Sequence, residues 1–169
     1  MSCANALYDR IIRVDLAGEK GACAIYAGQV WALALMNKRC SLIESMYTQE
    51  VSHVVLFEKL QKEYGARPTA LGPLWNVLGW GVGVVTGCAG VKSAMTCTTA
   101  VEDVIADHYA KQINQLSPDN PLVPVLKQCQ DDEIHHGHQS TSHGGEIHSV
   151  LGKAIKRGTQ LAVWLSERI

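Results

Sequence analysis

The chain has 169 residues, and this length suits one domain with a sizeable core over residues 1–169. Its 15 Lys and Arg residues nearly balance its 16 Asp and Glu residues, so it carries no basic footprint for nucleic acid. The six cysteines form no Cys-x-x-Cys pair, and we expect them to be reduced thiols in a reducing compartment. The first ten residues lack the Arg-rich or apolar character of a targeting peptide.

Apolar residues at helical spacing predict two long helices in the first part of the chain. The first is expected over about residues 7–37. The second is expected from residue 41 to about residue 64, because Ser41-Leu42-Ile43-Glu44 has the form of a capping box. Gly65 and Pro68 are expected to end this helix.

An uncharged segment over residues 68–91 follows, and three further helices are predicted beyond it. They are expected over about residues 93–116, 122–143 and 146–168, the last of them amphipathic. No segment alternates polar and apolar residues over a useful length. The predicted fold class is therefore all-α.

Four of these helices repeat one pattern of acidic residues and histidines. A helix with a single Glu precedes a helix with Glu-x-x-His, and the intervals between these residues are the same in both halves. The six candidate metal ligands are Glu19, Glu50, His53, Glu102, Glu133 and His136. Residues i and i+3 share a helix face, so each Glu-x-x-His presents a carboxylate and an imidazole together. Four carboxylates and two imidazoles are the ligand set of the di-iron and di-manganese bundles, which predicts an antiparallel four-helix bundle built from two helix pairs.

The alternative for a single glutamate is a solvated helix face. The surroundings of Glu102 argue against it, because Ala94, Met95 and Ile105 lie on or beside its face. A carboxylate on so apolar a surface must be paired, protonated or metal-bound. Carboxylate-rich ligation with only two imidazoles favours iron or manganese over metals that prefer thiolates.

The uncharged segment 68–91 is long enough to span a membrane. A span here would leave the two halves of the ligand set on opposite sides of the bilayer, so we expect a helical segment that contacts lipid without crossing. The alternative is an ordinary connecting helix packed on the bundle. Its two tryptophans suit an interfacial depth. The residues expected to face lipid or substrate are Leu74, Trp75, Leu78, Trp80 and Val84.

Tyr109 lies two turns beyond Glu102 on the same helix face, and Tyr26 has the same relation to Glu19. The repeat gives no reason to prefer one tyrosine, and the alternative role for either is a buried hydroxyl bonded to a carboxylate. His108 lies at the edge of the Glu102 face.

Ligand histidines usually donate their second ring N–H to an acceptor that fixes the tautomer. Asp132, which immediately precedes Glu133, is the candidate acceptor for the ring of His53.

With the ligand pattern in place, the chain closely resembles the demethoxyubiquinone hydroxylases of ubiquinone biosynthesis. The resemblance covers about residues 7–169. The runs that carry it are Arg10-Ile11-Ile12-Arg13-Val14-Asp15-Leu16-Ala17-Gly18-Glu19, Ile25-Tyr26-Ala27-Gly28-Gln29, Arg67-Pro68-Thr69, Pro73-Leu74-Trp75-Asn76-Val77-Leu78-Gly79 and Leu165-Ser166-Glu167-Arg168.

This resemblance implies a ferritin-like bundle that binds two iron ions and hydroxylates the ring of demethoxyubiquinone, using O2 and electrons from NADH. It implies peripheral attachment to the matrix face of the inner mitochondrial membrane, or in a bacterium to the cytoplasmic face of the inner membrane, and a lipid-binding partner protein. It favours Tyr109, with His108, as the quinone-site pair. Assembly into a homo-oligomer is left open.

Two rival functions remain. The first is a ferritin-like protein that oxidises or stores iron, which fits the uncharged segment 68–91 poorly. The second is a membrane-associated helical scaffold without enzymatic activity, in which the Glu and His pattern is coincidental.

Overall fold

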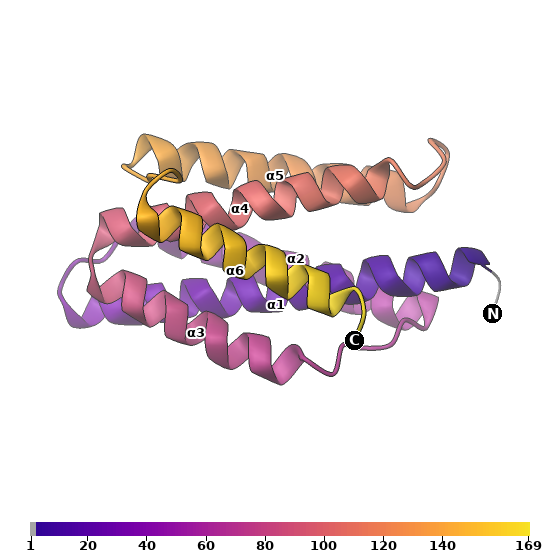
Figure 1. Ribbon diagram of the computed structural model, residues 1–169, viewed down its shortest axis with the longest axis horizontal. Coiled ribbons are helices and arrows are strands. Elements are labelled where there is room, and N and C mark those ends of the chain that lie inside the picture. The colour runs from indigo at the N-terminus through magenta and orange to yellow at the C-terminus, as the bar shows by residue number, and fades with distance from the viewer. Residues whose placement is uncertain (1–2) are drawn as a thin grey trace. The chain divides into compact units, whose positions relative to one another are not determined.

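The computed structural model describes residues 3–169, with side chains from residue 6 onward, and this part of the chain is helical without strands. This confirms the all-α prediction. The helices, labelled in Figure 1, are α1 (Cys3–Leu35), α2 (Ser41–Tyr64), α3 (Gly72–Cys88), α4 (Val91–Ile113), α5 (Leu122–Ser142) and α6 (Val150–Ser166).

Local backbone chemistry explains where these helices begin and end. α1 ends two residues before the predicted limit because Asn37 adopts a left-handed conformation with φ 52°. The N–H of Lys38 then donates to the carbonyl of Leu33 at 2.9 Å, which closes the helix end. Gly65 ends α2 in the same conformation, with φ 65°, as its sequence position predicts.

α2 begins at Ser41 as predicted, but its predicted cap and the predicted start of α6 differ from the structure. The predicted capping box at Ser41 does not form, because Ser41 is already the first helical residue and the N-cap is Cys40, which makes no side-chain cap bond. α6 begins at Val150 rather than near residue 146. Its N-cap hydroxyl is that of Ser149, which accepts the N–H of Gly152 at 3.0 Å.

The chain divides into two compact units. The first unit holds the chain up to Val91 together with Leu161–Ile169, and the second unit holds Lys92–Gln160. In the first unit α2 runs antiparallel to α1, and α3 runs beside α1 in the same direction (Figure 1). In the second unit α4 and α5 form an antiparallel pair.

Glycines bring α3 unusually close to α1. A Cβ atom placed on Gly83 would lie 2.0 Å from the carbonyl oxygen of Ile25, and one placed on Gly79 would lie 2.8 Å from that of Gly21. On the other side of the contact, a Cβ on Gly28 would lie 2.4 Å from the carbonyl oxygen of Trp80. No other residue type fits at these positions without separating the two helices, because the obstructing atoms belong to the backbone.

Hydrogen bonds hold the end of α6 on the first unit. The buried guanidinium of Arg13 is paired with Asp9 and donates to the carbonyl of Ser166 at 3.4 Å and to that of Glu167 at 3.2 Å. The Ser166 hydroxyl accepts the indole N–H of Trp75 at 2.9 Å. The Leu165–Arg168 run therefore has a structural role, because it joins the C-terminal end of α6 to α1 and α3.

Among the described helices, none is both long enough and apolar enough to cross a membrane. α3 nevertheless exposes large apolar side chains. Of the residues predicted to face lipid, Leu74, Leu78 and Trp80 are exposed, whereas Trp75 and Val84 are half-buried. Val77 and Val85, which sequence reasoning did not single out, are the most exposed apolar residues of this helix, at 70% and 68%.

Candidate metal centre

The first unit brings three of the predicted ligands together. Glu19 comes from α1, and Glu50 and His53 come from one buried face of α2. Each offers a ligand atom within 4.8 Å of the other two. The Nδ1 atom of His53 lies 3.4 Å from a carboxylate oxygen of Glu19 and 3.9 Å from one of Glu50.

The second unit brings the other three ligands together in the same way. Glu102 comes from α4, and Glu133 and His136 come from α5; all three are buried. Their ligand atoms also lie within 4.8 Å of one another, and Nδ1 of His136 lies 3.6 Å from a carboxylate oxygen of Glu133. A Cβ placed on Gly137 would lie 3.7 Å from the Cβ of Glu102, in ordinary van der Waals contact.

Each set fits a metal ion by its chemistry and its spacing. Two carboxylates and one imidazole are hard-to-borderline donors that suit iron or manganese. An ion with bonds of about 2.1 Å holds its ligands within about 4.2 Å of one another, so small side-chain rotations would close either set. Buried carboxylates at this density also need a positive partner, because an isolated buried charge is strongly destabilising.

The thiol of Cys23, one turn beyond Glu19, does not extend the first set. Burial, and then the negative charge of Glu19, raise the pKa of Cys23 to about 12. The thiol is therefore neutral near pH 7 in the metal-free protein, and Cys23 is not among the residues whose ligand atoms gather in the first set.

The two candidate quinone-site residues lie on α4 and are buried. A ring nitrogen of His108, Nε2, lies 2.8 Å from the side-chain nitrogen of Gln112. Sequence reasoning missed Gln112, although its position four residues after His108 places it on the same helix face. Tyr109 is 1% exposed and Tyr26 is 2% exposed, so burial does not distinguish the two tyrosines.

Asp132 is half-buried on α5, and its carboxylate accepts the side-chain N–H of Gln128 at 3.3 Å. This bond orients the carboxylate along its own helix. The predicted contact of Asp132 with His53 stays a prediction.

The helices and the two buried ligand sets define an all-α protein with carboxylate- and imidazole-rich candidate metal sites. Residues 6–166 match the family model described as ubiquinone biosynthesis protein COQ7. The chain therefore belongs to this family, which confirms the resemblance read from its sequence.

Named relatives from bacteria and eukaryotes agree with the family match. The 3-demethoxyubiquinol 3-hydroxylase of Rhodospirillum rubrum is 41% identical over 168 residues, covering 97% of this chain and 79% of the relative. The mitochondrial NADPH-dependent 3-demethoxyubiquinone 3-hydroxylase of Homo sapiens is 41% identical over 173 residues, covering 98% and 79%. The mitochondrial 5-demethoxyubiquinone hydroxylase of Saccharomyces cerevisiae is 33% identical over 184 residues, covering 97% and 79%.

Proposed function

We propose that this protein hydroxylates the ring of demethoxyubiquinone in ubiquinone biosynthesis, as a monooxygenase that uses O2. Membership of the COQ7 family and the names of the relatives support this reaction. The observation that carries the proposal within the molecule is the occurrence of one buried Glu, Glu and His set in each unit, at equal sequence intervals.

In this proposal the two units form one ferritin-like domain in which both ligand sets meet and hold two iron ions. Glu19, Glu50 and His53 contribute one half of the site, and the matching residues of α4 and α5 contribute the other. Four ionised carboxylates balance the charge of two ferrous ions. Bound iron supplies the O2 chemistry that amino-acid side chains lack. The burial of the ligands excludes bulk water from the reacting atoms.

The direct test is a reaction with purified, iron-loaded protein. A demethoxyquinone, O2 and a nicotinamide donor should yield the hydroxylated quinone, measured by mass spectrometry. O2 consumption with ferrous iron alone, without a quinone requirement, would instead support the rival iron-oxidising protein. Absence of bound iron after reconstitution would support the scaffold.

We expect the electrons to come from a reduced nicotinamide. The family resemblance implied NADH, whereas several mitochondrial relatives are named NADPH-dependent. The reaction should therefore be run with each donor separately, and the ratio of the two initial rates decides between them.

Tyr109 is assigned to the quinone site in this proposal, with His108 beside it. Tyr109→Phe should keep the iron and the fold, because the ring still fills its buried space, but should reduce turnover at least about tenfold through loss of one hydrogen-bonding group. Iron content, circular dichroism and product formation check these three expectations. Normal turnover in Tyr109→Phe together with impaired Tyr26→Phe would move the role to the first half of the repeat.

α3 is assigned to lipid contact, because the substrate carries an apolar polyprenyl tail and this helix exposes Val77, Leu78 and Trp80. The proposed location is the surface of the inner mitochondrial membrane on its matrix side, or the inner membrane of a bacterium on its cytoplasmic side. A lipid-binding protein remains the proposed partner.

Val77→Asp should weaken binding to phosphatidylcholine vesicles about tenfold or more, since a charge would then enter the lipid interface. Vesicle sedimentation measures this. The matched control is Val150→Asp on α6, because Val150 is also highly exposed, at 87%, but does not lie on α3. An equal loss in both variants would argue against α3 as the contact.

A further inference from the structure

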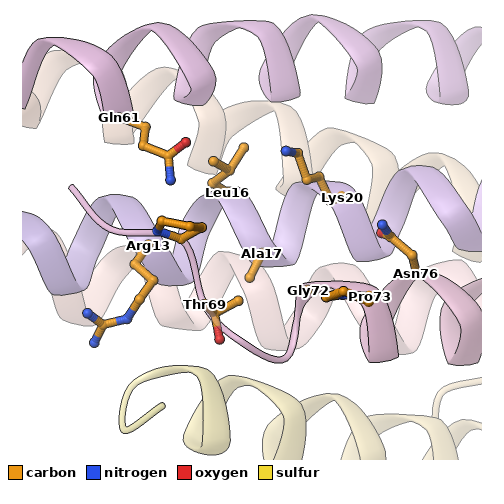
Figure 2. A pocket seen from close by; sticks show the side chains of 10 residues that line it. Arg13, Leu16, Ala17, Lys20, Gln61, Thr69, Gly72, Pro73 and Asn76 are labelled. Atoms are coloured by element: carbon orange, nitrogen blue, oxygen red, sulfur yellow. The ribbon is translucent and has the colours of Figure 1, made fainter. Parts of the chain in front are cut away.

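A cavity of about 240 Å³ lies beside α3 in the first unit, and its lining residues include none of the candidate metal ligands. Its polar walls come from Arg13 and Lys20 of α1, Gln61 of α2, Thr69 of the loop and Asn76 of α3 (Figure 2). The α1 residues of this cavity recur at i, i+3, i+4 and i+7, on a face centred about 110° from Glu19 around the helix. The cavity therefore does not open on the candidate iron site from α1.

The cavity is lined by several hydrogen-bond donors, beside which the side chains of Gln61, Asn76 and Thr69 also carry acceptor oxygens. Among its described lining residues, four polar side chains carry N–H groups, and none is a carboxylate. The side-chain nitrogen of Gln61 is buried without a hydrogen-bond partner, and in Figure 2 it points from α2 toward α1. A buried donor in this position calls for an acceptor from outside the protein.

Two positive charges reinforce this preference. Lys20 lies 2.8 Å from the carboxylate of Glu58, and Arg13 is paired with Asp9, but neither anion lines the cavity. An ammonium has three donors and a guanidinium has five. Arg13 also donates to the carbonyls of Ser166 and Glu167, so it keeps fewer N–H groups for a ligand than Lys20 and the amides supply together. The start of α3, at Gly72, adds the positive end of a helix dipole and has no side-chain cap.

The apolar surface of α3 continues from the mouth of the cavity. Pro73 lines the cavity, and Val77 and the exposed Trp80 follow it at i+4 and i+7 on the same helix face. A ligand with an acidic head and a hydrocarbon chain can therefore place its head in the cavity and its chain along α3. A quinone ring offers only neutral carbonyl oxygens, which match the two cations less well.

We propose that the cavity between α1, the end of α2 and the start of α3 binds the phosphate headgroup of an acidic phospholipid. This inference rests on the proposed lipid contact of α3 and adds a specific site to it. The bound headgroup would fix the depth and orientation of the helix at the membrane.

The test is sedimentation with vesicles of phosphatidylcholine alone and with one-fifth phosphatidylglycerol. The wild-type protein should prefer the acidic vesicles. Gln61→Leu and Lys20→Met should each lower binding to the acidic vesicles about tenfold, the effect of one charge-assisted hydrogen bond, and leave binding to phosphatidylcholine unchanged. Asn76→Leu is a third variant for which we expect the same loss. Asn76 is exposed, so this substitution does not disturb the core.

Lys62→Met is the matched control, because Lys62 is an exposed cation on α2 next to Gln61 and does not line the cavity. An equal loss in this control, or no preference for acidic vesicles in the wild type, overturns the headgroup site but leaves the α3 contact in place. The α3 contact is tested separately, by the binding of the Val77→Asp variant to phosphatidylcholine vesicles. If inorganic phosphate raises the unfolding temperature as much as dihexanoylphosphatidylglycerol does, the occupant is free phosphate and the lipid assignment is wrong.

Discussion

Replacing Glu50 or Glu133 by Ala is expected to abolish hydroxylation and to lower the iron content to about half of the wild-type value or less. Each substitution removes a charge and a ligand together from a buried set. Without metal, the variants should be at least as stable as the metal-free wild type, because a buried carboxylate without a metal ion opposes folding. Metal analysis, product formation and thermal unfolding of the metal-free proteins measure the three effects.

Glu58→Ala is the control for these variants. Glu58 lies on the same helix as Glu50, but its side chain is 43% exposed and pairs with Lys20. Its hydrogen bond with that ammonium lowers its pKa, so it is an ionised surface carboxylate without a role in the ligand sets. Iron content and activity should stay at wild-type levels. Full iron occupancy in either Glu50→Ala or Glu133→Ala would exclude that residue as a ligand.

Most helices could be predicted from the sequence because their signals are local. The helical spacing of the apolar residues and the position of Gly65 predicted α2 over the residues that the structure shows. His53 and Phe57 lie on its buried face as expected. The start of α6 was predicted less well. The hydroxyl of Ser149 donates to the carbonyl of Glu146 in the preceding turn and accepts the N–H of Gly152 at the helix start, so it bonds to both segments. A polar stretch offers several side chains that could cap a helix in this way, and the sequence alone does not show which of them does so.

The ligand pattern could be predicted for a similar reason. Spacing along a helix determines which side chains share a face, and the i, i+3 interval alone places Glu133 beside His136. The cavity beside α3 could not be predicted, because Gln61, Lys20 and Asn76 meet only through the packing of three separate helices. Sequence patterns describe one helix at a time and contain no such distances.

The close contact between α3 and α1 at Gly83 predicts a large effect on stability. Gly83→Ala is expected to destabilise the protein by about 3 kcal/mol, at the upper end of what overpacking costs. The new methyl group would meet the carbonyl oxygen and carbon of Ile25 at 2.0 and 2.8 Å. Backbone atoms cannot rotate away, so α3 must move off α1. Denaturant unfolding measures the change in free energy.

Gly81→Ala is the matched control, since it makes the same chemical change two residues away on α3. A Cβ atom there meets nothing within 4 Å, and the substitution should stabilise the helix by about 0.5–1 kcal/mol. The rings of Trp31 and Trp80, whose centroids are 5.6 Å apart, report on the α1–α3 contact. Their near-ultraviolet circular dichroism should change in Gly83→Ala and stay the same in Gly81→Ala. Equal stability of the two variants would show that α3 does not need to approach α1 so closely.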